Sequence, residues 1–143
     1  NLIDKYELVF FKHPKRNCIY NEIDVCNILK KEKKTKLFLI KKFLLSQNYP
    51  KNNGLVATGF IFREHNKKNI TLLMKYITNL LLKYTTRDQL IFNYSMWKLK
   101  QNYESLNIDI FTNKYFYLIN HKNYKVSFIS KLKLYVYNIF TIK

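Results

Sequence analysis

The stretch NYPKNNGLVATGFIF, residues 48–62, decides how the rest of the chain is interpreted. Its first seven residues contain proline, glycine and three asparagines, and they form the strongest loop signal in the sequence. The next eight, Leu55–Phe62, are rich in β-branched and aromatic residues, which predicts a strand. A loop that leads into a strand therefore separates two groups of helical sequence.

Before this stretch, residues 6–11 (YELVFF) predict a buried strand that stops at Pro14. Two helices are expected next, over residues 20–33 and 35–47, with the lysine-rich residues 30–34 as the turn between them. Apolar residues recur at helical spacing at Ile19, Ile23, Cys26 and Leu29 in the first helix and at Leu37, Ile40, Phe43 and Leu44 in the second.

After the central stretch, residues 70–81 predict an amphipathic helix, and a further helix is expected to begin at Thr85 or Thr86. Short strands are predicted at residues 107–111 and 115–119. The tail from Lys125 fits either an alternating strand or a basic helix. Strands separated by helices predict one α/β domain over residues 1–143, with parallel members in its sheet.

The composition predicts a folded chain, because 48% of the residues are hydrophobic and 17% are aromatic. The apolar runs are too short to cross a bilayer, and no signal peptide opens the chain, so we expect a cytoplasmic protein. The chain begins at Asn1 rather than at methionine, so we expect coding sequence upstream. Cys18 and Cys26 match no zinc or disulfide pattern and are expected to be buried free thiols.

The formal charge of +17 has two interpretations. It is typical of proteins that bind nucleic acid or touch an anionic membrane as peripheral proteins. It also fits AT-rich coding, since the chain has 23 lysines, 17 asparagines and only three arginines. The second interpretation is favoured, and it makes most of the charge a property of the solvated surface.

The three arginines, Arg16, Arg63 and Arg87, stand out in a chain that otherwise uses lysine. A guanidinium binds carboxylate or phosphate in a two-pronged geometry that an ammonium cannot reproduce. Each arginine also has polar neighbours, His13, Glu64-His65 and Asp88-Gln89 respectively. The arginines are therefore candidate ligand-binding residues.

The small residues are equally concentrated, since Gly54, Ala57 and Gly59 lie within six positions. They allow either a close-approaching ligand or a tight turn at Gly54 with close helix packing at Gly59. Thr86 and Gln89 have the spacing of a capping box, so this segment has a structural interpretation beside a functional one.

Three blocks of sequence together resemble a known family: FKHPKRNCIYNE (11–22), YPKNNGLVATGFIFREHN (49–66), and RDQLIFNY (87–94) followed by Trp97. The family is a glycosyltransferase-like domain family, long catalogued as having unknown function. It includes plant proteins linked to seed mucilage and bacterial proteins of surface-polysaccharide gene clusters. The resemblance covers residues 6–121 and leaves 122–143 as a basic aromatic tail.

The resemblance implies a GT-A-like fold, that of the nucleotide-diphospho-sugar transferases, with a mixed, mostly parallel sheet flanked by helices. It also implies transfer of a sugar from a nucleotide donor to a glycan or other acceptor, with Mn²⁺ or Mg²⁺ on the donor diphosphate. The family's acidic Asp-Gly-Asn stretch would fall before Asn1, so the domain is expected to be incomplete at its N-terminus. The chain alone is therefore expected to be inactive, and to have no need of the metal.

By the same resemblance, Arg87, Asp88 and Gln89 are the candidate catalytic residues and would contact the transferred sugar or the acceptor. Substrate binding would involve His13, Arg16, Asn53, Gly54, Thr58 and Arg63. His121 is similar in place to a histidine that completes the metal site.

Two other hypotheses stay open. One is a basic module that binds nucleic acid or another polyanion, which the charge favours; the scarcity of arginine and the lack of a recognisable motif argue against nucleic acid. The other is a catalytically silent remnant whose incomplete sheet exposes apolar surface and promotes association.

Overall fold

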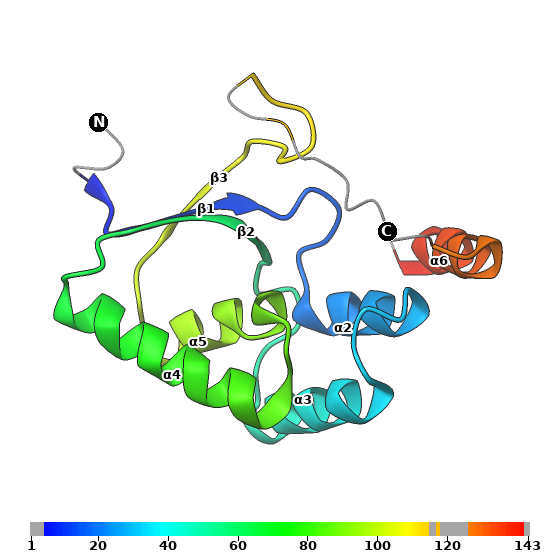
Figure 1. Ribbon diagram of the computed structural model, residues 1–143, viewed down its shortest axis with the longest axis horizontal. Coiled ribbons are helices and arrows are strands. Elements are labelled where there is room, and N and C mark those ends of the chain that lie inside the picture. Colours follow the sequence, from blue (N-terminus) through cyan, green and yellow to red (C-terminus); the bar gives the residue numbers. More distant parts are fainter. Residues whose placement is uncertain (1–4, 115–116, 118–125, 142–143) are drawn as a thin grey trace.

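A computed structural model describes residues 5–114, 117 and 126–141. Three strands form a sheet that lies on a layer of helices, with the last helix at the side of the molecule (Figure 1). The chain is thus an α/β protein, as predicted. Its elements are β1 (Leu8–Lys12), α2 (Ile19–Ile28), α3 (Lys34–Ser46), β2 (Val56–Arg63), α4 (Lys68–Tyr84), the 3-10 helix η1 (Asp88–Leu90), α5 (Phe92–Lys98), β3 (Glu104–Leu106) and α6 (Phe128–Thr141).

The sheet is mixed, in the order β2-β1-β3. β1 pairs antiparallel with β2 and parallel with β3. The expected excess of parallel pairing is wrong for the described strands, because the longer of the two pairings is antiparallel. The reason is the connection: two consecutive helices, α2 and α3, join β1 to β2. The second helix reverses the direction of the first and returns the chain to the end of the sheet that it left.

A large bulge interrupts β2 where it passes β1. Phe10 lies opposite Ile61, whereas the next residue, Phe11, lies opposite Ala57, so residues 58–60 project out of the ladder. Bulges of this kind redirect side chains and are common beside functional sites. Here the bulge displaces Thr58 and Gly59 from the sheet.

Three sequence predictions need correction or completion. α2 ends at Ile28 rather than at residue 33, because Lys30 adopts a positive φ of 54° and the Lys31 amide bonds back to the Cys26 carbonyl. Residues 107–111 do not form a strand; the Asp109 carboxylate instead accepts a hydrogen bond from the Phe111 amide in a local turn. The predicted strand at 115–119 lies outside the described residues except for residue 117.

The tail, which the sequence left between strand and helix, forms α6. The Ser127 hydroxyl accepts a hydrogen bond from the Ser130 amide and caps the helix at its N-terminus. No helix in the described part of the chain is long and apolar enough to cross a membrane.

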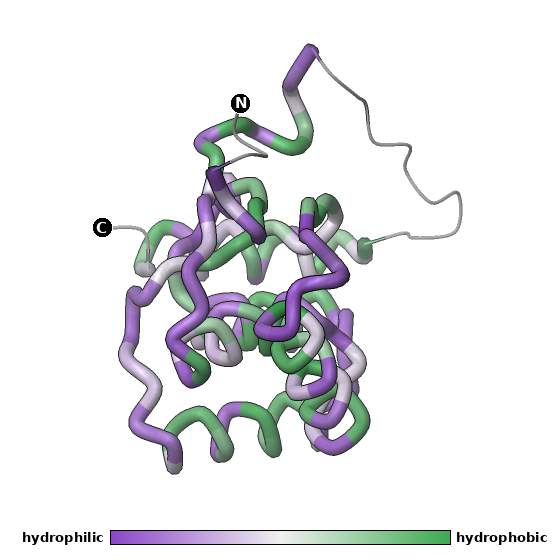
Figure 2. The backbone as a smooth tube through the Cα atoms, turned by 90° about the vertical axis from the view of Figure 1, so that its left-hand side faces the viewer, coloured by the Kyte–Doolittle hydropathy of each residue, from purple (hydrophilic) through white to green (hydrophobic). Residues whose placement is uncertain are grey.

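The core lies between the sheet and the helices beneath it. Leu8 and Phe10 of β1 point into it, and the Phe10 ring packs edge-on against Phe92 and Tyr103, with centroids 5.3 and 5.9 Å apart. α4 contributes one apolar side through Ile70, Leu73, Ile77 and Leu80. The helices alternate hydrophobic and hydrophilic residues along the backbone (Figure 2), as expected for helices that bury one face.

The two glycines have different structural roles, which stability measurements can separate. Gly54 has φ +82°, and an added Cβ would lie 3.4 Å from Asn93 Nδ2, whereas a Cβ on Gly59 would meet nothing within 4 Å. The turn expected at Gly54 is confirmed, and close helix packing at Gly59 is wrong.

We expect Gly54→Ala to lower the free energy of unfolding by about 1–2 kcal/mol, because alanine is strained at positive φ. Gly59→Ala, the matched control, should change it by less than about 0.5 kcal/mol. Urea denaturation of both variants is the measurement, and equal losses would contradict the assignment.

Candidate functional site

A cleft of about 420 Å³ opens beside the β2 bulge, where α2, η1 and α6 approach one another. It gathers residues from five segments of the sequence: 13–31, 57–59, 87–89, 110–111 and 134. Among its lining residues are six of the predicted site residues: His13, Arg16, Thr58, Arg87, Asp88 and Gln89.

The floor of the cleft holds a buried ion pair. The Glu22 side chain is 2% exposed, and its Oε2 accepts a hydrogen bond from Arg16 Nε at 2.5 Å. Its other oxygen, Oε1, accepts from the Cys26 thiol at 3.6 Å. Burial, reinforced by the Glu22 carboxylate, raises the pKa of Cys26 to about 11, so this thiol stays protonated at neutral pH. Both cysteines are buried free thiols, as expected.

His13 lies beside this pair as a neutral imidazole. Its Nδ1 accepts hydrogen bonds from the backbone amides of Lys15 and Arg16, at 3.2 and 3.0 Å. Burial, followed by the Arg16 charge, lowers its pKa to about 4 in spite of Glu22. Since Nδ1 is an acceptor, the hydrogen-bond pattern assigns the single ring proton to Nε2. Nε2 lies 3.3 Å from Arg16 Nη2 and 3.9 Å from Glu22 Oε2, so this nitrogen faces the ion pair and His13 contributes an uncharged ring to the cleft.

Arg87 also lines the cleft, but its guanidinium, unlike that of Arg16, forms no ion pair with a described carboxylate. Its Nε is buried and has no hydrogen-bond partner among the described residues. No described carboxylate lies within ion-pair distance of it either, because the ion pairs among the described residues involve His13, Arg16, Lys41 and Lys67. A buried donor without an acceptor is costly, by about 1–3 kcal/mol, and rare in folded proteins.

Asp88 and Gln89 connect η1 to the β2 bulge. Asp88 Oδ1 accepts hydrogen bonds from the Thr58 hydroxyl and the Gln89 amide, at 2.9 and 2.8 Å. The Gln89 side-chain nitrogen donates to the Val56 carbonyl at 3.3 Å. These contacts hold the polar side chains in place and leave the second carboxylate oxygen of Asp88 and the amide oxygen of Gln89 for a ligand.

The segment before Arg87 is held by Glu32, in the turn between α2 and α3. Glu32 Oε2 accepts from the Thr85 hydroxyl and from the amide and hydroxyl of Thr86. Burial opposes ionisation, but these bonds and the Lys33 amide lower the Glu32 pKa to about 2. The predicted capping box is therefore wrong: Thr86 donates to Glu32 and makes no cap, and η1 starts after Arg87.

The remaining predicted site residues are not brought into this cleft. Asn53 is exposed and its amide donates to the Tyr49 hydroxyl, while Gly54 lies against Asn93 and Tyr103. Arg63 lines a different hollow of about 460 Å³ near the start of α4. His121 lies outside the described residues.

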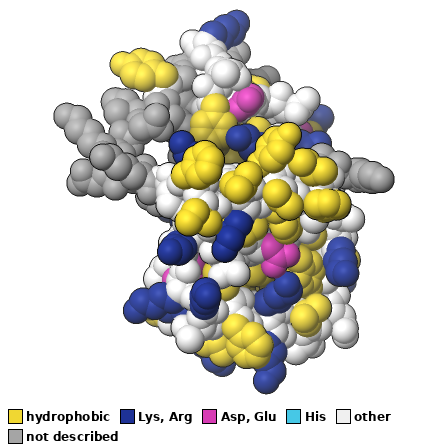
Figure 3. Space-filling model, turned by 90° about the vertical axis from the view of Figure 1, so that its right-hand side faces the viewer, with side chains coloured by type: hydrophobic (Ala, Val, Ile, Leu, Met, Phe, Trp, Pro, Cys, Tyr) yellow, Lys and Arg dark blue, Asp and Glu magenta, His cyan; other side chains and the backbone are white. Residues whose placement is uncertain are grey.

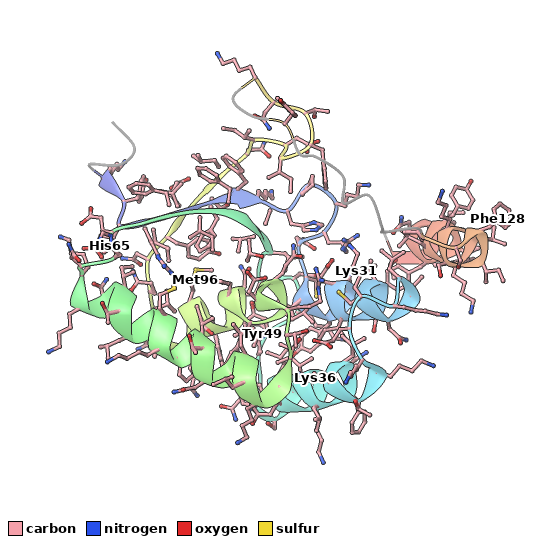
Figure 4. All side chains as sticks on the ribbon, in the orientation of Figure 1. Lys31, Lys36, Tyr49, His65, Met96 and Phe128 are labelled. Carbon is pink, nitrogen blue, oxygen red and sulfur yellow. The ribbon has the colours of Figure 1, made fainter. Side chains whose placement is uncertain are left out.

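That second hollow carries less chemistry than the cleft. It includes Arg63 and His65 but no carboxylate, and Arg63 reaches the Met74 sulfur. Figure 4 shows His65 at the far end of the molecule from Lys31, which lines the cleft. The cleft is therefore the better candidate site.

Sequence reasoning missed Glu22, Lys31 and Glu32. A signal existed for Glu22, because it lies three residues after Ile19 and four before Cys26, on the side of the helix predicted to be buried. A carboxylate at such a position needs a nearby cation. Nothing local distinguishes Lys31 or Glu32 from the other charged residues of their lysine-rich turn.

The described residues do not form a donor set for a divalent ion. They contain no group of three histidine, cysteine, aspartate or glutamate side chains that could hold a metal. Of the two carboxylates in the cleft, Glu22 is paired with Arg16 and Asp88 is partly used by Thr58. The expected Mn²⁺ or Mg²⁺ thus remains a prediction.

Comparison with known proteins identifies the chain's relatives. The model of one protein family, the TOD1/MUCI70 glycosyltransferase-like domain, matches residues 2–125. Neither the curated proteins nor the solved structures contain a significant match. Because the family match spans most of the sequence and includes every side chain of the cleft except Leu134, the chain belongs to the TOD1/MUCI70 glycosyltransferase-like domain family.

Proposed function

We propose that the cleft binds the diphosphate and sugar of a nucleotide-sugar donor, and that the domain transfers this sugar to a glycan or other acceptor. Family membership supports the reaction class. The observation that carries the proposal is the buried Arg87 Nε, which has no acceptor among the described residues, in a cleft that also contains Lys15, Lys31 and the Arg16–Glu22 pair.

The charges in the cleft favour an anion. Arg16 and Glu22 neutralise each other, so among the described residues that line the cleft Arg87, Lys15 and Lys31 are balanced only by the Asp88 carboxylate. A phosphate oxygen would satisfy the Arg87 guanidinium and take up the negative charge of a departing nucleoside diphosphate. The neutral His13 ring adds no charge to the site.

The polar groups of η1 suit the sugar of the nucleotide-sugar donor. Asp88 and Gln89 are held by Thr58 and Val56, which supports a role for their remaining oxygens as acceptors for the hydroxyl groups of a sugar. Gly59 has no side chain to obstruct that approach. No described side chain is assigned as a covalent nucleophile.

A GT-A-like arrangement and a place in polysaccharide biosynthesis are part of this proposal, since both rest on the resemblance alone. Binding is therefore the property to measure first.

Isothermal titration calorimetry with uridine and guanosine diphosphates and their sugar conjugates tests the proposal. We expect Arg87→Gln to weaken binding about 10-fold or more, because it removes a charge-assisted contact from a buried site. Arg63→Gln removes the same charge outside the cleft and should leave affinity unchanged. Equal losses in both variants, or no binding by the unmodified chain, would overturn it.

The polyanion hypothesis predicts a different result. Single-stranded RNA should then bind with a steep salt dependence, and Arg63→Gln should weaken that binding as much as Arg87→Gln. Nucleotide-sugar binding that depends on Arg87 alone would exclude this alternative as the function of the cleft.

A further inference from the structure

The last helix, α6, contacts the rest of the protein through its less apolar side. Ser130 is buried there, and Leu134 and Tyr137 are half-buried. The Tyr137 hydroxyl donates to Asp24 of α2 at 3.4 Å. Burial and the Asp24 charge raise the pKa of Tyr137 to about 12, so this hydroxyl keeps its proton. These contacts fix which face of α6 points outward.

The outward face of α6 is almost entirely apolar. Phe128 and Phe140 are 80% and 79% exposed. Positions 128, 132, 135 and 139 follow the spacing of a single helical face, and positions 129, 136 and 140 extend it on one side. The exposed apolar side chains of this face are Phe128, Ile129, Leu132, Tyr135, Val136, Ile139 and Phe140. Soluble surfaces rarely present so many large apolar side chains together.

Lysines border this face on both sides. At 100° per residue, Lys131 lies at one edge of the apolar arc and Lys133 at the other, and both are exposed. Figure 3 shows hydrophobic side chains gathered on this side of the molecule with Lys and Arg side chains among them. Figure 4 shows Phe128 directed away from the body of the protein. The order lysine, apolar arc, lysine is that of a helix lying in a membrane interface.

We propose that α6 binds the surface of an anionic lipid bilayer, with its apolar arc among the acyl chains and Lys131 and Lys133 at the headgroups. The charge favours an anionic bilayer over a second copy of the chain as the partner of α6. Two molecules with a net charge of +17 repel each other, whereas an anionic surface attracts both lysines and the whole protein. The helix lies along the surface and does not cross it.

This arrangement has a consequence for the cleft. Leu134, on the inner side of α6, forms part of the cleft wall. A bilayer on the outer side of the same helix therefore lies within one helix diameter of the cleft, about 10 Å. A ligand or acceptor carried at the lipid surface would be close to it.

Vesicle flotation with the 143-residue chain tests the proposal. Three proteins are compared: the unmodified chain, Leu132→Asp/Ile139→Asp, and the matched control Leu72→Asp/Leu82→Asp. All four leucine and isoleucine side chains are at least half exposed, at 54%, 53%, 54% and 81%, so folding should be preserved in both variants. Each double substitution also changes the net charge by the same amount.

On vesicles of phosphatidylcholine with about 30% phosphatidylglycerol, the unmodified chain and the α4 control should bind alike. The α6 variant should bind at least about 10-fold more weakly, because it loses two apolar side chains that the bilayer would bury. Binding by the unmodified chain should persist in part at about 0.5 M NaCl, where surface charge is screened.

Equal binding by the two variants would overturn the proposal, since only charge would then matter. So would a lack of vesicle binding together with self-association that the α6 substitutions abolish, because a second copy would then cover the helix. These measurements read lipid binding alone and do not depend on the function of the cleft.

Discussion

Replacing Arg16 with methionine should lower the free energy of unfolding by about 3 kcal/mol, because Glu22 then keeps a buried carboxylate without its cation. Glu22 is almost completely buried, and Arg16 Nε is its charge-assisted donor. The Cys26 thiol that remains is a weak donor and cannot replace a guanidinium.

A double-substitution cycle separates the ion pair from simple packing. Arg16→Met combined with Glu22→Leu removes both charges and keeps similar volume, so it should lie within about 1 kcal/mol of the unmodified chain. Urea denaturation at neutral pH gives the four free energies. If the double variant were as unstable as Arg16→Met alone, the loss would come from packing and not from an uncompensated carboxylate.

The second large effect is acid destabilisation through His13. Its pKa is lowered from 6.5 to about 4 by burial and by Arg16, so protonation favours the unfolded chain. The stability that depends on neutral His13 is complete above pH 6.5 and is lost as the pH falls from 6.5 to about 4. A shift of this size corresponds to about 3 kcal/mol.

His13→Asn is the appropriate comparison. The asparagine Oδ1 can replace Nδ1 as acceptor for the Lys15 and Arg16 amides, but it does not titrate near neutral pH. Between pH 7 and pH 4 the unmodified chain should therefore lose about 3 kcal/mol more than the variant. Parallel pH profiles of the two proteins, measured by urea denaturation, would show that His13 does not carry this sensitivity.

Much of the fold could be predicted from local signals. The helix at 34–46 and the strand at 56–63 lie within one residue of expectation, because each has a clear periodicity and the loop at 48–54 separates them. The failures have physical causes. Residues 107–111 look like a strand, yet the Asp109 side chain bonds to the backbone and forms a turn.

The candidate site could be predicted only in part. His13, Arg16, Thr58, Arg87, Asp88 and Gln89 were expected from rarity and resemblance, and they meet in one cleft. Arg63 was expected on the same grounds but lies in another hollow. Rarity shows that a residue is unusual, but it does not show on which side of the sheet its side chain lies.

The amino-acid sequence by itself determined the α/β class, the order of most elements, the family and the set of unusual polar residues. The class and the order follow from periodicity and turn residues, which are local along the chain. The family follows from the resemblance of three blocks of sequence, and the polar residues stand out by their rarity. The tertiary structure decided the antiparallel partner of β1, the bulge that brings Thr58 toward Asp88, the Arg16–Glu22 pair, and the outward direction of the apolar face of α6. Each of these depends on which distant segments pack together, and packing depends on the whole chain at once.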